Sequence, residues 1–193
     1  TLNKFSVIIS NVTQLDVGRY RWNWFMRAVN NSANDFADVA SLVEAGNQPA
    51  GAQFTAAMEK VADMDNWMRT WAVRHSLGDW DFYGSQNAQN SYSYKPKNGR
   101  WNVFIFDMNI IMGNSGSWAA GANLFPTGSP GGSYTPGNPP TDAVMPKIFS
   151  NAKFRRMYLR ALKDICLGPM TAPNLAAVVD AKYAAFLAHG IAP

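Results

Sequence analysis

The spacing of apolar residues in the first half of the chain predicts helices. Residues 34–46 open with an asparagine suited to capping and stop at a glycine, and residues 51–64 repeat apolar side chains at helical spacing. Residues 64–78 continue this spacing and carry two tryptophans on the face expected to point inward. Within this last stretch, Asp65 is the expected N-cap and Gly78 the expected residue after the helix.

Two further helices are predicted near the end of the chain. One begins at Ser150 or Asn151, and its cationic run Lys153–Arg160 falls partly on one solvated face. The other covers residues 172–190, with proline in its first turn and glycine at its end.

A β-hairpin is predicted between these two groups of helices. Residues 91–95 alternate in polarity, residues 96–99 have the composition of a turn, and residues 100–106 form a second apolar strand. The run from Trp101 to Phe106 is expected to be buried. Residues 113–141 are rich in glycine, serine and proline and are expected to form a long irregular loop.

Two stretches near the start of the chain complete the prediction. Residues 4–10 have the pattern of a short strand, while the aromatic residues 20–29 fit a strand or a helix equally well. The order of these elements predicts a single helix-dominated α+β domain over residues 1–193.

Composition and charge narrow the function classes. The chain has 193 residues, of which 47% are hydrophobic and 16% charged, which is typical of a folded domain. A net charge of +4 without a strong basic stripe argues against a nucleic-acid partner, and no apolar run is long enough for a membrane span. The single cysteine, Cys166, lies in an apolar segment and is expected to be a buried thiol. Asn11 and Asn30 begin glycosylation sequons.

The hairpin ends in an unusual carboxylate. Asp107 directly follows an apolar strand and is the only acidic residue between Asp81 and Asp142. Such a carboxylate is costly unless it is paired or binds a metal. Together with Asp81 and Asn90, it supplies the hard oxygen ligands that magnesium prefers beside phosphate groups.

Spacing alone leaves other interpretations of these residues open. Aspartate and asparagine are common turn residues, so Asp81 could form an Asx-turn and Asp79 could cap or pair locally. Asn87 lies between the candidate ligands in the sequence and is a further candidate oxygen ligand for a metal.

Several short motifs together resemble the CotH kinase family, the spore-coat-protein-H-like atypical kinases. These motifs are GDWD at 78–81, NSYSY at 90–94, KNGRW at 97–101, FDMN at 106–109 with Gly113, and the later FSNAKFRRMYLRAL. The resemblance covers residues 61–188. It implies a kinase-like C-terminal lobe, ATP and magnesium or manganese as cofactors, and phosphorylation of protein serine or threonine on spore or cell-surface proteins.

The resemblance also assigns roles to individual residues. Asp81 matches the catalytic aspartate, and Asn90 and Asp107 match the residues that bind the metal and the nucleotide phosphates. Asn109 stands where the family often has a second metal-binding aspartate. Asp79 and Asn87 are alternative residues for these catalytic and metal-binding roles. The family further implies a secreted or cell-surface location.

Two alternatives to an active kinase follow from the same comparison. Residues 1–60 contain no convincing match to the nucleotide-facing lysine and its partner glutamate, so the N-terminal nucleotide lobe is expected to be missing. The chain would then be a non-catalytic pseudokinase in a cell-surface or extracellular assembly, where Trp118, Phe125 and Tyr134 could anchor a protein partner or another copy. An extracellular carbohydrate-binding module rests only on the aromatic content of 13%.

Overall fold

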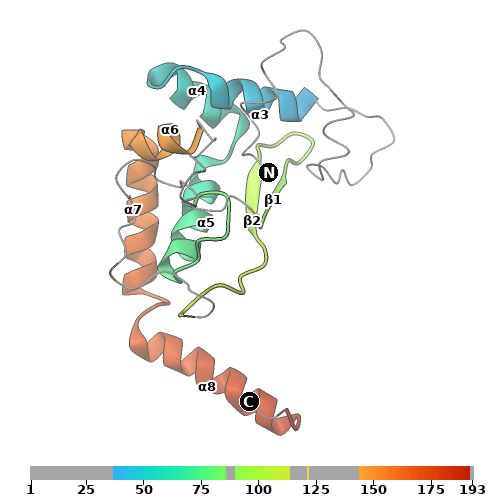
Figure 1. Cartoon of the computed structure of the whole chain (residues 1–193), viewed down its shortest axis with the longest axis vertical. Helices are drawn as coiled ribbons and strands as arrows, with labels where there is room; N and C mark the ends of the chain where they lie inside the picture. The colour runs from blue at the N-terminus through green and yellow to red at the C-terminus, as the bar shows by residue number, and fades with distance from the viewer. Residues whose placement is uncertain (1–36, 86–89, 114–120, 122–143, 192–193) are drawn as a thin grey trace, which may run out of the picture.

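The computed structural model describes residues 37–85, 90–113, 121 and 144–191 (Figure 1). The helices of this part are α3 (Ala37–Asn47), α4 (Ala52–Val61), α5 (Met64–Ser76), α6 (Val144–Ser150), α7 (Ala152–Leu167) and α8 (Ala172–Ala188), and the strands are β1 (Ser91–Tyr94) and β2 (Asn102–Ile105). The helix-dominated α+β prediction is therefore confirmed in outline. Residues 4–10 and 20–29, the two sequons, Asn87, and Trp118, Phe125 and Tyr134 lie outside the described residues.

Helix α5 lies at the centre of the core and packs along α7 (Figure 1). Its Trp67 and Trp71 are buried, as predicted, and the ring of Trp71 lies 5.1 Å from that of Phe149 at the end of α6. The loop after α5 closes tightly over this cluster at Gly84, which has a φ of 123°. A Cβ atom at Gly84 would lie 2.6 Å from the Trp71 ring, so only glycine fits there.

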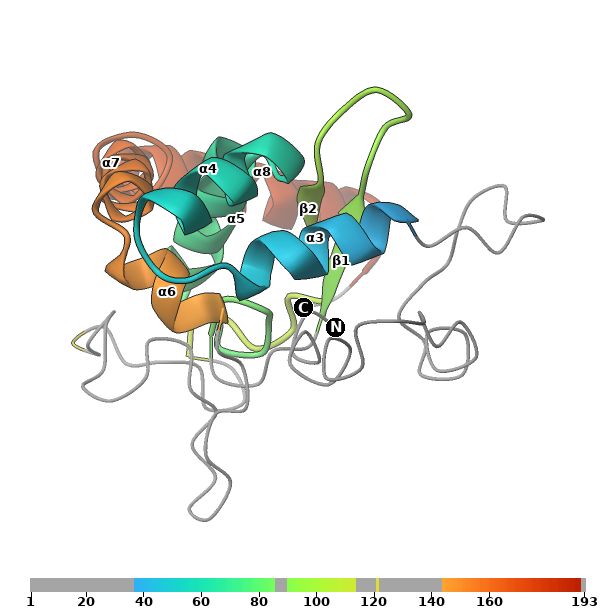
Figure 2. The ribbon, with the colours of Figure 1, turned by 90° about the horizontal axis from the view of Figure 1, so that it is seen from above.

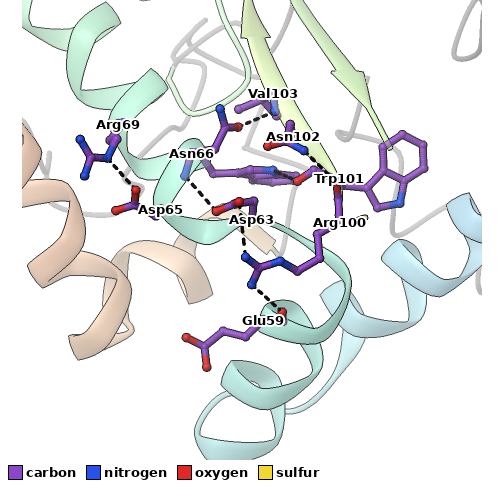
Figure 3. A network of polar contacts seen from close by, with 10 residues as sticks. Glu59, Asp63, Asp65, Asn66, Arg69, Arg100, Trp101, Asn102 and Val103 are labelled. Carbon is purple, nitrogen blue, oxygen red and sulfur yellow. Dashed lines mark hydrogen bonds and ion pairs between the residues drawn. The ribbon is translucent and has the colours of Figure 1, made fainter. Parts of the chain in front are cut away.

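The two ends of α5 test the predicted caps. The N-cap is Asp63, whose carboxylate accepts a hydrogen bond from the backbone N–H of Asn66 at 3.3 Å. The prediction of Asp65 is wrong, because Asp65 lies in the first turn and forms an exposed ion pair with Arg69 (Figure 3). Gly78 follows the helix with a φ of 76°, which confirms the predicted end.

The β-hairpin is confirmed and rests with one face on α5. Strands β1 and β2 are antiparallel, and Ser93 pairs with Val103. The Asn66 side chain accepts a hydrogen bond from the backbone N–H of Val103 at 2.7 Å (Figure 3). The Trp67 indole donates to the carbonyl of Trp101 at 2.9 Å.

Burial of the whole run from Trp101 to Phe106 is contradicted. Only Val103 is buried, whereas Phe104, Ile105 and Phe106 are exposed. The described hairpin is covered by α5 on one face only, so Phe104 and Phe106 turn away from the core. Ile105 shares the face of Val103 but lies at the end of β2, where it stays exposed. A run that looks uniformly apolar therefore has two different faces.

The predicted start of α7 is confirmed. Asn151 is its N-cap and accepts hydrogen bonds from the N–H groups of Lys153 and Phe154 at 3.0 and 3.2 Å. Phe154 is buried while the cationic side chains of Lys153, Arg155, Arg156 and Arg160 are exposed, as expected for a solvated face. The prediction of a buried Cys166 is wrong, because its side of α7 is exposed.

Helix α8 extends away from the packed helices (Figure 1). It begins after Thr171 with proline in its first turn and is followed by Gly190 with a φ of 69°, as the sequence predicted. None of its residues is buried. Among the described helices, none has the length and apolar character required to cross a membrane.

Candidate functional site

A buried arginine organises the chain around the hairpin. Arg74 lies in the last turn of α5, and its Nε donates to Asp79 Oδ2 at 2.6 Å. Both side chains are 1% exposed, so this is a fully buried ion pair. Asp79 thus pairs locally, one of the two roles that the sequence allowed, and it is engaged in the core rather than presented to a ligand.

The same guanidinium joins the two ends of the hairpin. Arg74 Nη1 donates to the main-chain oxygen of Asn90, just before β1, at 2.6 Å and to that of Phe106, just after β2, at 3.0 Å. Its Nη2 is buried without a hydrogen-bond partner among the described residues, and the guanidinium carbon lies 4.5 Å from the Phe82 ring centre. A planar fork of donors suits this bridging role, which a lysine could not fill.

Asp81 and Asn90 are brought into direct contact. Asn90 Nδ2 donates to Asp81 Oδ2 at 2.7 Å, and the backbone N–H of Asp81 donates to Asp79 Oδ1 at 2.9 Å. Asn90 has a φ of 42°, a left-handed conformation that asparagine tolerates better than most residues. The Arg74–Asp79 pair therefore supports both members of this contact.

Asp107 is linked to the same group through its backbone. It follows Phe106, whose carbonyl is held by Arg74, and it has a φ of 51°. Its side chain is exposed and forms no hydrogen bond or ion pair with the described part of the chain. Asn109, two residues further on, is also exposed. The described contacts place no side-chain oxygen of Asp107 or Asn109 directly on Asp81 or Asn90.

The oxygen donors present are compatible with a hard divalent cation. The Asn90 amide uses its nitrogen toward Asp81, and no described residue donates to its Oδ1. The Asp107 carboxylate is similarly unengaged within the described residues, and both atom types are preferred ligands of magnesium. Over the same part of the chain, no three histidine, cysteine or acidic side chains are grouped as a metal site would require.

His75 lies beside Arg74 but faces the core. Its Nδ1 is 2.9 Å from the Tyr158 hydroxyl on α7, and its ring lies 5.1 Å from that of Phe82. Burial, and secondly the nearby Arg74 charge, lower the pKa of His75 to about 3, so the imidazole is neutral at pH 7. Burial likewise raises the pKa of Tyr158. His75 lies in the last turn of α5, but its neutral imidazole carries no charge that could interact with the helix dipole.

Sequence reasoning missed Arg74 as part of the site. The inward stripe expected from the sequence was Trp67, Trp71 and Val73, but Val73 is only half-buried and residue 74 is the position that faces inward. The available signal was an arginine at this position of the helix, followed five residues later by an aspartate beyond the helix end. The site residues that the sequence did name are Asp81, Asn90, Asp107 and Asn109, of which the described contacts join the first two directly.

Comparison with known proteins gives one match. The sequence model of a family described as CotH kinase protein matches residues 14–190 of the chain. No curated protein and no solved structure matches it. The matched range includes every described helix and strand, and of the described residues only Ile191 lies outside it.

Proposed function

The chain belongs to the CotH kinase protein family, and on that premise we propose that it transfers phosphate from ATP to serine or threonine of a protein substrate. The observation that carries the proposal is the contact between Asp81 and Asn90, held by Arg74 together with the strand end that precedes Asp107. An aspartate, a downstream asparagine and an aspartate after a hairpin occur in this order in protein kinases.

Each residue has a distinct role in this proposal. Asp81 orients the substrate hydroxyl and accepts its proton as the oxygen attacks the γ-phosphorus, while the bond from that phosphorus to the bridging oxygen of ADP breaks. Asn90 Oδ1 and the Asp107 carboxylate would hold magnesium or manganese, with Asn109 as an additional oxygen ligand. When bound, the cation neutralises charge on the nucleotide phosphates.

The test begins with nucleotide binding. Asp107→Ala should weaken magnesium-dependent ATP binding by about 10-fold or more, because it removes the charged ligand of the cation. Since Asp107 is exposed and forms no contact with another described side chain, its removal should lower the melting temperature only slightly, by the cost of placing alanine at a φ of 51°. Asp164→Ala, an exposed carboxylate on α7, is the matched control and should change neither property.

Transfer itself is measured by mass spectrometry of substrate and protein after incubation with ATP. Asp81→Asn should abolish the added phosphate while retaining ATP binding, because it removes the proton acceptor and keeps the shape. ATP binding that is the same with and without magnesium, or unaffected by Asp107→Ala, would contradict the proposed site.

A non-catalytic assembly role is the second candidate, and helix α8 favours it. A helix that is apolar around most of its surface is normally covered, yet all described residues of α8 are exposed or half-exposed. Binding of ATP without transfer to any substrate, together with a stable protein complex, would favour this candidate. With either candidate function, we propose that the protein is secreted or lies on the cell surface. Fractionation of the native source would test this location.

A further inference from the structure

Helix α7 concentrates the positive charge of the chain. Its 16 residues include five lysines and arginines and one aspartate, a net charge of +4 that equals the net charge of the whole sequence. The rest of the sequence therefore carries as many acidic as basic side chains. The cations of α7 are all exposed and are Lys153, Arg155, Arg156, Arg160 and Lys163. Charge gathered on one helix creates a local positive potential, which attracts an anionic partner.

Three of these cations form a row on the outer side of α7. Arg156, Arg160 and Lys163, here called the cationic row, follow one another at intervals of four and three residues, so they share one face and span about 10 Å. The opposite face of α7 carries the buried Phe154 and Tyr158 and packs on α5. Because α5 lies between α7 and the hairpin (Figure 1, Figure 2), the row faces away from the candidate site.

No described carboxylate forms an ion pair with the cationic row. The ion pairs of the described chain use other cations, as in Lys153 with Glu59 at 2.5 Å and Lys95 with Asp38 at 2.9 Å. Asp164 is the one acidic residue of α7, and no described ion pair joins it to the row. Within the described residues, all three charges of the row therefore lack a counter-charge in contact.

The placement of these cations does not stabilise the helix. Arg156 and Arg160 are like charges four residues apart, and Lys163 follows three residues later, which are spacings at which like charges repel. The first turn contains Lys153 and Arg155 and no acidic residue, although the helix dipole favours carboxylates there. The stability of α7 therefore does not explain its charges, so their reason lies outside the helix.

Two exposed leucines adjoin the cationic row. Leu167 follows Lys163 by four residues and is 70% exposed, and Leu159 lies between Arg156 and Lys163 and is 42% exposed. A protein segment with acidic and apolar side chains can use both the charges and the leucines. A nucleic acid would use the charges alone, because its bases stack on aromatic side chains and the exposed face of α7 has none.

We propose that the cationic row and its two leucines are a docking site for an acidic, partly apolar segment of another protein. Outside the described residues, the acidic residues of the sequence are Asp16, Asp35 and Asp142, which form no acidic run that could fill this role. Complementary charge steers such a partner to the surface and fixes its register. Since the row faces away from Asp81 and Asp107, docking there leaves the candidate site uncovered. The inference does not depend on phosphoryl transfer.

Binding of a labelled peptide tests the docking site. The probe is a fluorescein-labelled helical peptide with glutamates and leucines on one face, and fluorescence anisotropy at low salt follows its binding to the full chain. Arg156→Glu with Arg160→Glu should weaken binding by about 10-fold or more, because repulsion replaces attraction at two points. The control, Lys97→Glu with Lys182→Glu, changes the net charge equally at two exposed lysines outside α7 and should weaken binding by less than about 3-fold. Equal losses for the two double variants, or no binding to the parent, would overturn the proposal.

Two further probes identify the kind of partner. Leu159→Ser with Leu167→Ser should weaken binding of the leucine-containing peptide by about 5-fold and leave binding of polyglutamate unchanged, because only the first probe buries apolar surface. Single-stranded DNA that binds more tightly than the peptide would overturn the proposal and make a nucleic acid the occupant. Salt-dependent dimerisation that the double reversal at Arg156 and Arg160 abolishes would likewise overturn it, with a second copy as the occupant.

The melting temperature distinguishes lost docking from lost structure. Arg160→Glu replaces repulsion from Arg156 and Lys163 by attraction, so it should lose peptide binding without a lower melting temperature. A marked drop in the melting temperature of this variant would mean that the row supports the fold, and would contradict a docking role.

Discussion

Replacing Arg74 with leucine should be among the most damaging single changes in the described core. The substitution leaves Asp79 buried without its counter-charge and removes the donor from the carbonyls of Asn90 and Phe106. Removing one partner of a buried ion pair costs about 3–5 kcal/mol. The lost carbonyl hydrogen bonds add to this only in part, because all of them belong to one network. We therefore expect a loss of about 4 kcal/mol in the free energy of unfolding.

Urea denaturation at pH 7 measures this loss, and the chain supplies its own control. Arg69 lies on the same helix and pairs with Asp65 at the same 2.6 Å, but the two side chains are 66% and 57% exposed. Arg69→Leu should leave the denaturation midpoint nearly unchanged, because water screens an exposed pair. Equal losses for the two variants would refute the argument that burial makes Arg74 structurally important.

A double variant separates charge from packing. Arg74→Leu with Asp79→Leu removes both charges, so much of the lost stability should return even though the ion pair is absent. Arg74→Lys retains the charge but loses the planar fork, and should fall between the parent and Arg74→Leu. A double variant less stable than Arg74→Leu would mean that the uncompensated Asp79 charge is not the main cost.

Three further changes test separate parts of the structure. The pKa of His75 is about 3 in the folded protein and about 6.5 in the unfolded protein, so the unfolded state binds more protons and stability falls as the pH drops through this window. Between pH 7 and 4.5, the free energy of unfolding measured with urea should fall by about 2–3 kcal/mol more in the parent than in His75→Gln. Equal losses would contradict the burial of the neutral imidazole. Gly84→Ala should lower the free energy of unfolding by about 2 kcal/mol or more, because its Cβ would lie 2.6 Å from the Trp71 ring. Gly113→Ala has a φ of 91° but open space around it, so it should lose only about 1 kcal/mol from backbone strain. Similar denaturation midpoints for the two variants would count against the close approach at Gly84. Asn151→Ala should lower stability by about 1 kcal/mol or more, because it removes two capping hydrogen bonds and the donation from Asn151 Nδ2 to Thr55 Oγ1 at 2.6 Å. Asn151→Asp keeps the cap but not the bond to Thr55, so it should restore part of the loss. An unchanged denaturation midpoint for Asn151→Ala would argue against the cap.

The local patterns that could be predicted were those decided by neighbours in the sequence. The turn composition of residues 96–99 and the alternation before it predicted the hairpin, and Asn151 predicted the start of α7. In each case the hydrogen bonds that decide the structure are local: they join two strands connected by one turn, or the Asn151 side chain and the first turn of its own helix. The sequence therefore contains the determining information.

The cap of α5 shows where such local reasoning stops. Asp63 and Asp65 are both chemically suitable N-caps, and spacing does not choose between them. The choice is made by a long-range contact: the backbone N–H of Asp63 donates to the carbonyl of Trp101 at 2.9 Å, and that of Trp101 donates to Val61 at 2.8 Å. This contact with the hairpin holds residue 63 outside the helix, so its carboxylate becomes the cap.

The same limit explains why Arg74 was absent from the predicted site. Helical periodicity predicts which positions face inward, but a charged residue at such a position is normally interpreted as exposed. The burial of Arg74 becomes favourable only because its guanidinium meets three acceptors, which belong to Asp79, Asn90 and Phe106. These three residues lie at increasing distances from Arg74 along the chain. That arrangement also joins core stability to the candidate site, since the group that neutralises Asp79 fixes the backbone on both sides of the hairpin. The four residues named from the sequence carry the proposed chemistry. Arg74, which holds the backbone at Asn90 and just before Asp107, was marked in the sequence only by its helical register and its spacing from Asp79.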